Sequence, residues 1–255
     1  MQSKDWISSR DGTKLYIKPA LVDNPKHTIV LVHGFAEHIG RYQDLIERLN
    51  QSNMNVIGLD FRGHGQSDGQ RGYIDSLSQY EEDLDAAVQT AKQKTGTQKV
   101  TILAHSMGAL IASCYAVNRA DQVSGLILSS PLIALSVKVP YWKQQVGQIM
   151  STLWPTFSMP NTMDPKYLSH DPKTVQDYEK DPLVFHEVNA RWFEQVTGFK
   201  GEAIKIAAKI QTPMLVQLSD EEQIVSFDAS KEWFDHIPGA DSSVKVYEGF
   251  YHEIY

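Results

Sequence analysis

The stretch Ile102-Leu103-Ala104-His105-Ser106-Met107-Gly108-Ala109-Leu110 decides how this sequence is interpreted. The apolar run at residues 99–103 predicts a strand, and residues 107–118 predict a helix. The residues two positions before and two positions after Ser106 are alanine and glycine. A serine between a strand and a helix, with small residues on both sides, is typical of a nucleophile elbow, where a sharp turn exposes the hydroxyl group. Ser106 is therefore the candidate nucleophile.

Short apolar runs alternate with helical patterns along most of the chain. This alternation predicts an α/β fold, with a mostly parallel central sheet and helices on both faces. Near-continuous apolar runs are typical of central strands, so each run is expected to be one. Asp11-Gly12 predicts a hairpin at an antiparallel edge of the same sheet. The expected strands are residues 28–32, 55–59, 99–103, 123–128, 213–217 and 244–247, and the expected helices are residues 41–50, 77–94, 107–118 and 229–236.

The regular alternation stops between about residues 131 and 200, where helical pieces rich in Trp, Met, Phe and Leu are separated by Pro140, Pro155, Pro160, Pro165, Pro172 and Pro182. We therefore divide the chain into a core, residues 1–130 and 201–255, and an inserted helical cap, residues 131–200. An apolar insertion between two strands is expected to cover a pocket at the carboxyl edge of the sheet.

Composition excludes several classes of protein. The chain has 255 residues, 42% hydrophobic and 22% charged, which predicts one globular domain with its insertion. The net charge of -7 and the lack of a long basic cluster argue against nucleic acid as a partner. The polar N-terminus has no secretory pattern, so a cytoplasmic protein is expected. No metal or cofactor is expected, and the single cysteine, Cys114, is expected to pack as a core residue.

A serine nucleophile requires a base and an acid that orients the base. His252 follows the last expected strand, which places it at the same sheet edge as Ser106. The expected strand at 213–217 runs into three carboxylates, Asp220, Glu221 and Glu222, and charge alone does not choose among them. The other histidines lie in polar, cap or loop settings or adjoin the serine: His27, His64, His105, His170, His186 and His236, besides His33 and His38.

Acyl transfer also requires two backbone N–H donors for the oxyanion. Met107, directly after the serine, is expected to supply one. The second is expected after an early strand, and His33-Gly34-Phe35 follows residues 28–32. The N–H of Phe35 is therefore the second candidate donor.

Four separated segments resemble the monoacylglycerol lipase and lysophospholipase family of α/β-hydrolases. The resemblance spans nearly the whole chain, and the segments occur in the order that the family has. They are His33-Gly34-Phe35-Ala36-Glu37-His38-Ile39-Gly40-Arg41-Tyr42, Asp60-Phe61-Arg62-Gly63-His64-Gly65-Gln66-Ser67-Asp68-Gly69, Ala104-His105-Ser106-Met107-Gly108 and Gly249-Phe250-Tyr251-His252-Glu253.

This resemblance implies an α/β-hydrolase fold and a role for each matching residue. It implies Ser106 as nucleophile, His252 as base, and Phe35 and Met107 as oxyanion donors. The family's aspartate falls on Glu222, with Asp220 as the second choice for the acid. Members of the family usually continue past the histidine into a final helix, whereas this sequence ends at Tyr255.

The resemblance further implies a serine carboxylester hydrolase that cleaves monoacylglycerols through an acyl-enzyme, without a cofactor. The alternatives are a lysophospholipase, a general carboxylesterase or thioesterase with the same triad, and a non-catalytic ligand-binding protein of the same fold. The cap is implied to form an apolar tunnel for the lipid ester and to make transient contact with a membrane surface. The cap residues that suit these roles are Trp142, Ile149, Met150, Leu153, Trp154, Phe157 and Met159.

Overall fold

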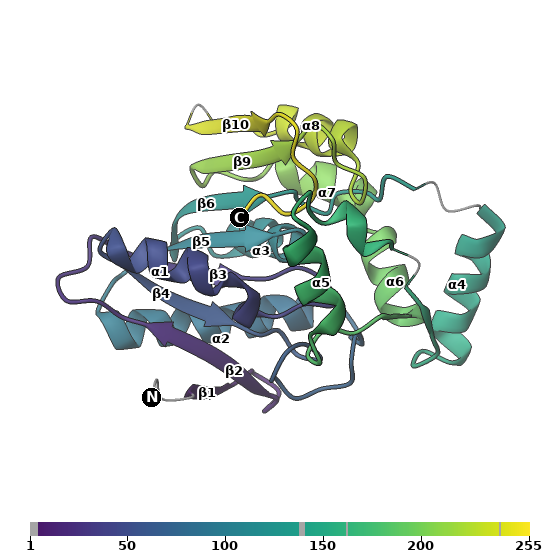
Figure 1. The fold of residues 1–255 in the computed structure, drawn as a ribbon, viewed down its shortest axis with the longest axis horizontal. Coiled ribbons are helices and arrows are strands. Elements are labelled where there is room, and N and C mark those ends of the chain that lie inside the picture. Colours follow the sequence, from purple (N-terminus) through teal and green to yellow (C-terminus); the bar gives the residue numbers. More distant parts are fainter. Residues whose placement is uncertain (1–4, 138–140, 162, 240) are drawn as a thin grey trace.

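An eight-stranded sheet runs through the computed structural model (Figure 1), which describes residues 5–137, 141–161, 163–239 and 241–255. The strands lie side by side in the order β1-β2-β4-β3-β5-β6-β9-β10. Strands β1 and β2 form the antiparallel edge, and β3 to β6, β9 and β10 are parallel. The bounds are β1 Asp5–Ser8, β2 Lys14–Ala20, β3 His27–Val32, β4 Met54–Leu59, β5 Val100–His105, β6 Val123–Ser129, β9 Met214–Ser219 and β10 Ser242–Tyr247.

Helices cover both faces of this sheet because successive strand residues point to opposite sides. On β3, Ile29 and Leu31 join a cluster with Ile46 of α1. The alternate residues, Val30 and Val32, join the larger cluster formed with α2 and α3. The core helices are η1 Ile39–Tyr42, α1 Gln43–Gln51, α2 Ser78–Thr95, α3 Met107–Asn118, α7 Lys200–Ala207 and α8 Phe227–Asp235.

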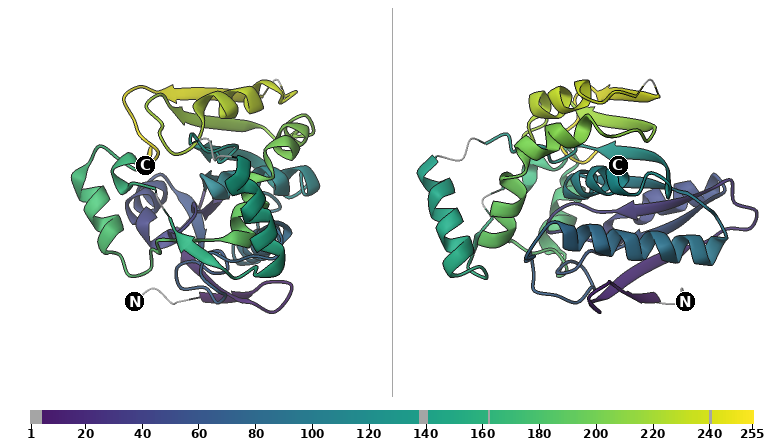
Figure 2. Two further views of the ribbon diagram at one scale, coloured as in Figure 1. Left: turned by 90° about the vertical axis from the view of Figure 1, so that its right-hand side faces the viewer. Right: turned by 180° about the vertical axis from the view of Figure 1, so that it is seen from behind.

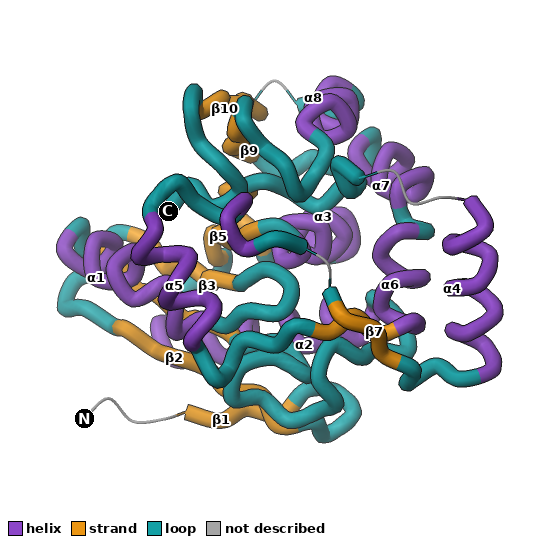
Figure 3. The backbone as a smooth tube through the Cα atoms, turned by 45° about the vertical axis from the view of Figure 1, so that its right-hand side comes forward, coloured by secondary structure: helices purple, strands orange, loops and turns teal. Residues whose placement is uncertain are grey.

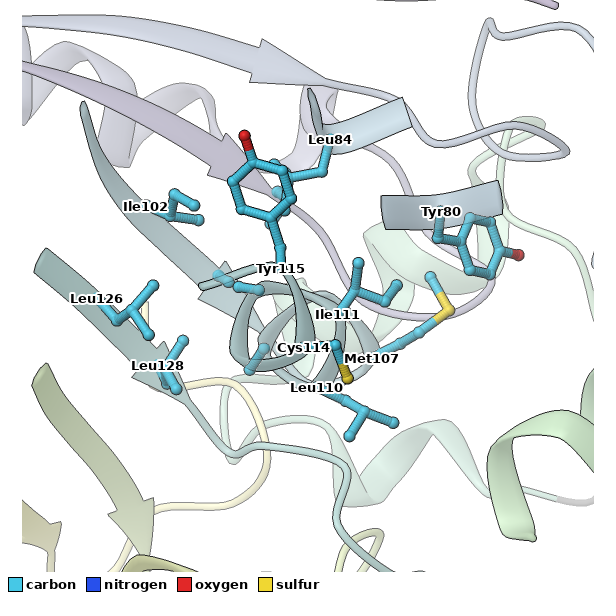
Figure 4. Close-up of a cluster of buried hydrophobic side chains, with 14 of the residues drawn as sticks. Tyr80, Leu84, Ile102, Met107, Leu110, Ile111, Cys114, Tyr115, Leu126 and Leu128 are labelled. Atoms are coloured by element: carbon cyan, nitrogen blue, oxygen red, sulfur yellow. The ribbon is translucent and has the colours of Figure 1, made fainter. Parts of the chain in front are cut away.

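Helix α3 is buried nearly all round, which holds the turn before it in a fixed position. Met107, Leu110, Ile111 and Tyr115 are each at most 2% exposed, and they belong to the buried cluster that also contains residues of β5, β6 and α2 (Figure 4). The expectation that Cys114 is a core residue is confirmed, because its side chain is buried within this cluster.

The cap elements lie between β6 and β9 in sequence. Figure 2 shows α4 and α6 together beyond one end of the strands, and the tube in Figure 3 shows α4 as the outermost helix, beside α6. The bounds are α4 Tyr141–Leu153, β7 Ser158–Pro160, η2 Pro165–Tyr167, α5 Pro172–Lys180, β8 Glu187–Asn189 and α6 Ala190–Thr197. Strands β7 and β8 form a small antiparallel sheet that the sequence analysis did not predict.

The expected strands and core helices are all present, and the hairpin around Asp11-Gly12 joins β1 to β2 as expected. One expectation is wrong: residues 244–247 do not form a central strand. They belong to β10, which lies at the edge of the sheet, and its residues are all at least partly exposed. The sequence Val-Lys-Val-Tyr is typical of a strand with one face exposed to solvent, because lysine interrupts the apolar run. The division into core and cap at residues 131 and 200 stays a prediction.

Candidate active site

Ser106 lies at the sharp turn between β5 and α3, in a backbone conformation that few non-glycine residues adopt. Its φ and ψ are 50° and -113°. The turn is held by its neighbours: the N–H of Ser106 donates to Ser129 O at 2.9 Å, and Leu132 N–H donates to Ser106 O at 3.1 Å. A Cβ at Gly108 would lie 2.5 Å from the backbone oxygen of His33. This close approach explains the small residue after the serine.

His252 and Glu222 form a buried pair at the carboxyl edge of the sheet. His252 Nδ1 lies 2.6 Å from Glu222 Oε2, and the two side chains are 5% and 3% exposed. The other oxygen, Glu222 Oε1, accepts from the N–H groups of Ile224 at 2.8 Å and Val225 at 3.3 Å. Asp220 instead accepts from Gly249 N–H at 2.8 Å. Glu221 Oε2 lies 3.4 Å from His170 Nε2, so of the three carboxylates after β9 the structure brings Glu222 to His252.

The two groups stabilise each other's charged forms. Burial alone would raise the pKa of Glu222, but the attraction and hydrogen bond from His252 and the two backbone N–H groups lower it below its usual value. Burial alone would lower the pKa of His252, but the charge and hydrogen bond of Glu222 raise it. An ionised carboxylate only accepts hydrogen bonds, so Nδ1 carries the proton of the neutral ring and Nε2 is left as a base.

Ser106 and His252 line the same pocket, a cavity of about 790 Å³. Its wall is mostly apolar and comes from the cap and from the loops after β3, β6, β9 and β10. The apolar lining residues include Leu132, Leu135, Val146, Met150, Phe157, Met159, Met163, Val188, Trp192, Phe193 and Ile224. A pocket of this size and character suits a ligand with a long apolar part.

The cap residues predicted for the tunnel and the membrane contact divide into two groups. Met150, Phe157 and Met159 line the pocket. The second group points outward: Ile149, Leu153 and Trp154 are 56%, 77% and 58% exposed. The side chain of Trp142 lies outside the described residues.

The backbone around Phe35 is held in a way that fixes the direction of its N–H. His33 Nδ1 lies 2.7 Å from Gly34 O, and His33 Nε2 accepts from Phe61 N–H at 3.1 Å. Because an N–H only donates, Nε2 is the acceptor nitrogen and Nδ1–H donates to Gly34 O. The Gly34 carbonyl and the Phe35 N–H belong to one planar trans peptide and point in opposite directions, so this bond also orients the Phe35 N–H.

Met107 offers the second N–H because it is the first residue of α3. The first N–H groups of a helix have no acceptor within it. The helix N-terminus also carries positive partial charge, which favours an anion there.

Three non-glycine residues with positive φ surround this site. Ala36, Ser106 and Ser130 have φ values of 65°, 50° and 44°. Ala36 follows Phe35, and the Ser130 hydroxyl donates to His252 O at 2.9 Å. Such conformations cost on the order of 1–3 kcal/mol each and persist where the surroundings impose them, commonly at functional sites.

The remaining histidines take other roles. The ring of His105 lies 4.6 Å from that of His252, and burial lowers the pKa of His105 to about 3, so its ring is neutral. His64 makes the expected local contact, with its Nδ1 3.0 Å from Arg62 O. Within the described residues no group of three His, Cys, Asp or Glu side chains could hold a metal ion, and no helix there is long and apolar enough to cross a membrane.

A protein-family model described as serine aminopeptidase S33, of the Hydrolase_4 group, matches residues 23–255. The chain belongs to this hydrolase family. The hydrolase is 31% identical over 233 residues to the monoacylglycerol lipase of Mycolicibacterium smegmatis, covering 91% of this chain and 83% of that lipase. An uncharacterized abhydrolase domain-containing protein of Dictyostelium discoideum is 31% identical over 236 residues, and the match spans 91% of the hydrolase but only 24% of that relative.

A crystal structure of Paleococcus ferrophilus monoacylglycerol lipase superposes on the hydrolase with a TM-score of 0.86 and 32% identity. The superposition covers 94% of this chain and 91% of that chain. These likenesses confirm the α/β-hydrolase fold and the resemblance to the monoacylglycerol lipase family.

Sequence reasoning assigned no role to three charged residues of the hydrolase, Glu37, Arg41 and Glu253, which also line the pocket. All three stand within the segments that carry the family resemblance. Their pairing was not visible in the sequence, because Arg41 and Glu253 are 212 positions apart.

Proposed function

We propose that the hydrolase is a serine carboxylester hydrolase that cleaves monoacylglycerols through an acyl-enzyme on Ser106. The observation that carries the proposal is the buried His252–Glu222 pair, whose histidine lines the same pocket as the strained serine. A non-catalytic binding protein would have no need of a base, an acid and a turn that exposes the serine in one place.

The geometry supports a two-step acyl transfer. His252 Nε2 takes the proton of Ser106 Oγ as Oγ attacks the ester carbonyl, and the N–H groups of Phe35 and Met107 receive the oxyanion. The tetrahedral intermediate collapses, and Nε2–H gives its proton to the departing glycerol. A water molecule, deprotonated by His252, then attacks the acyl-enzyme and releases the fatty acid and the free serine.

The pocket favours an ester with one acyl chain. Apolar side chains of the cap surround most of it, and Glu37, Arg41 and Glu253 supply a polar part of the wall beside His252. A monoacylglycerol has one long apolar chain and a small uncharged polar head. Two relatives at 31% and 32% identity, from Mycolicibacterium smegmatis and Paleococcus ferrophilus, are named monoacylglycerol lipases.

The decisive experiment compares Ser106→Ala with Ser113→Ala, a matched control in the helix that follows Ser106, whose hydroxyl donates to Ala109 O. Hydrolysis of monoacylglycerols and of p-nitrophenyl esters should be abolished in the first variant and kept in the second. Undiminished hydrolysis by Ser106→Ala would exclude the mechanism. Faster turnover of lysophosphatidylcholine, an acyl thioester or an aminoacyl p-nitroanilide than of any monoacylglycerol would contradict the substrate.

We also propose that the hydrolase contacts membrane surfaces transiently through α4, which would make it peripheral to a membrane. Ile149 and Leu153 are four positions apart on one face of this helix, and both side chains are exposed, as is that of Trp154. Neighbouring Met150 lines the pocket, so α4 separates the pocket from the surrounding medium. Exposed apolar stripes of this kind are typical of surface-binding helices.

Vesicle binding tests this surface with the variant Ile149→Ser/Leu153→Ser. It should bind phosphatidylcholine vesicles containing monoacylglycerol less than the wild type, yet hydrolyse a water-soluble ester at the same rate. Leu21→Ser is the matched control, since Leu21 is 48% exposed but lies on the core after β2. Equal vesicle binding by wild type and double variant would disprove the contact.

A further inference from the structure

A chain of three charged side chains joins the loop after β3 to the loop that carries His252. Arg41 Nη1 donates to Glu37 Oε2 at 2.7 Å and to Glu253 Oε1 at 2.6 Å, and Arg41 Nη2 donates to Glu253 Oε2 at 2.9 Å. The side chains of Arg41 and Glu253 are each 13% exposed, and that of Glu37 is 4% exposed. Two-pronged pairing of this kind fixes direction as well as distance.

At one end, this ion chain of Glu37, Arg41 and Glu253 holds the backbone that precedes Phe35, the candidate oxyanion donor. Glu37 Oε1 accepts from Gly34 N–H at 2.6 Å and from Tyr42 OH at 2.8 Å. Burial alone would raise the pKa of Glu37, but the attraction of Arg41, the neighbouring histidines and the Gly34 N–H together lower it to about 2, so this carboxylate remains an acceptor at neutral pH. Together with the bond from His33 to Gly34 O, both backbone groups of Gly34 are held.

At the other end, Glu253 is the residue next to His252, and its backbone is held as well. Glu253 N–H donates to Leu168 O at 2.9 Å, and His252 N–H donates to Tyr167 O at 3.4 Å, both in the cap. The guanidinium of Arg41 lies 4.9 Å from the centre of the Tyr178 ring on α5. The ion chain therefore ties two catalytic loops together and rests on the cap.

We infer that Arg41 and Glu253 are positioning residues, which hold the Phe35 N–H and the His252 ring at a fixed separation across the reacting ester. This inference rests on the proposed function. The physical reason is that both groups act on one tetrahedral centre, and a misplacement of about 1 Å can cost on the order of 100-fold in rate. Phe35 and His252 belong to loops 217 positions apart, and the bidentate Arg41–Glu253 pair joins these loops through side chains.

The protein offers a matched comparison for the loss of one carboxylate. Arg62 also lies between two carboxylates, with Nη2 2.6 Å from Asp83 Oδ1 and Nη1 2.6 Å from Asp11 Oδ2. This second cluster joins the β1–β2 hairpin to α2 and does not line the pocket. Asp11→Asn therefore removes one carboxylate from a guanidinium that keeps another, as Glu253→Gln does, but away from the site.

The experiment measures kcat, KM and the inhibition constant of an alkyl trifluoromethyl ketone for Glu253→Gln, Arg41→Lys, Asp11→Asn and the wild type. Ser106 adds reversibly to such a ketone and forms a tetrahedral oxyanion, so its affinity reports how well the site fits that geometry. In the two site variants kcat should fall between about 10-fold and 100-fold, with ketone affinity falling by a similar factor and KM changing less than about 3-fold. Asp11→Asn should keep kcat and ketone affinity.

Coupling between the two residues gives a second measurement. Arg41→Lys keeps the charge but cannot form the two-pronged pair with Glu253, so Arg41→Lys/Glu253→Gln should lose no more kcat than the worse single variant. Losses that multiply would overturn the inference, as would unchanged kcat in Glu253→Gln, a rise in KM alone, or an equal loss in Asp11→Asn. An inactive wild type, or an active Ser106→Ala, would instead refute the proposed function, so the two failures are distinguishable.

Discussion

Replacing Glu222 with glutamine tests how the acid sets the chemistry of His252. Glutamine has one acceptor oxygen. That oxygen is needed at the position of Oε1, which accepts from Ile224 N–H at 2.8 Å and from Val225 N–H at 3.3 Å. The amide NH2 group then takes the place of Oε2, 2.6 Å from His252 Nδ1. A donor there requires an unprotonated Nδ1, so the ring proton moves to Nε2 and the base is lost.

We expect kcat for a p-nitrophenyl ester to fall by about 10³–10⁴, the loss that an acid-to-amide change causes in a serine triad elsewhere. The free energy of unfolding should change by only about 1–2 kcal/mol, because both backbone donors keep a partner. Glu222 raises the pKa of His252, so loss of the Glu222 carboxylate should also shift the acid limb of the residual pH–rate profile to lower pH. Stopped assays across pH and thermal denaturation measure these three quantities.

Two companion variants make the expectation sharp. Glu222→Asp keeps the charge but shortens the side chain by about 1.5 Å. If the shorter carboxylate keeps its backbone bonds, it moves out of hydrogen-bond range of Nδ1, so its kcat should lie between those of Glu222→Gln and the wild type. Asp220→Asn should keep kcat, because Asp220 bonds to Gly249 N–H. A Glu222→Gln enzyme with more than a tenth of wild-type kcat, beside an inactive Asp220→Asn, would refute the reasoning and make Asp220 the acid.

Two further predictions concern stability. Gly108→Ala should lower the melting temperature and the esterase rate, because the added Cβ would lie 2.5 Å from a backbone oxygen. Gly201→Ala in α7 should instead stabilise the fold by about 0.5–1 kcal/mol, because its added Cβ would meet no neighbouring atom within 4 Å. Equal melting temperatures of the two variants would contradict this. The folded state lowers the pKa of Glu37 from 4.5 to about 2, so its contribution to stability is present above pH 4.5 and is lost as the pH falls toward 2. Urea unfolding from pH 6 to 2 should therefore show a shallower pH dependence for Glu37→Gln, and parallel curves would disprove the linkage.

Several features of the site could be predicted from the sequence because they depend on neighbours a few positions away. The strand before Ser106, the helix after it and the small flanking residues are set by local propensity and by the room in one turn. The alternation of apolar runs and helical patterns predicts parallel strands, and parallel strands bring their carboxyl ends to one edge. That places Ser106, Phe35 and His252 in the same region without any knowledge of coordinates.

Other features required the tertiary structure, because side-chain direction in an irregular loop depends on contacts far away in sequence. Asp220 and Glu222 are two positions apart, yet one accepts from Gly249 N–H and the other bonds to the ring of His252. On α4, Ile149 and Met150 are adjacent and both apolar, and only the position of the helix decides which faces the pocket. Residue type and spacing thus determined the strand, the turn and the candidate nucleophile. The candidate acid, the two faces of α4 and the ion chain between Arg41 and Glu253 were decided by long-range packing, which sets the backbone angles from which those side chains project.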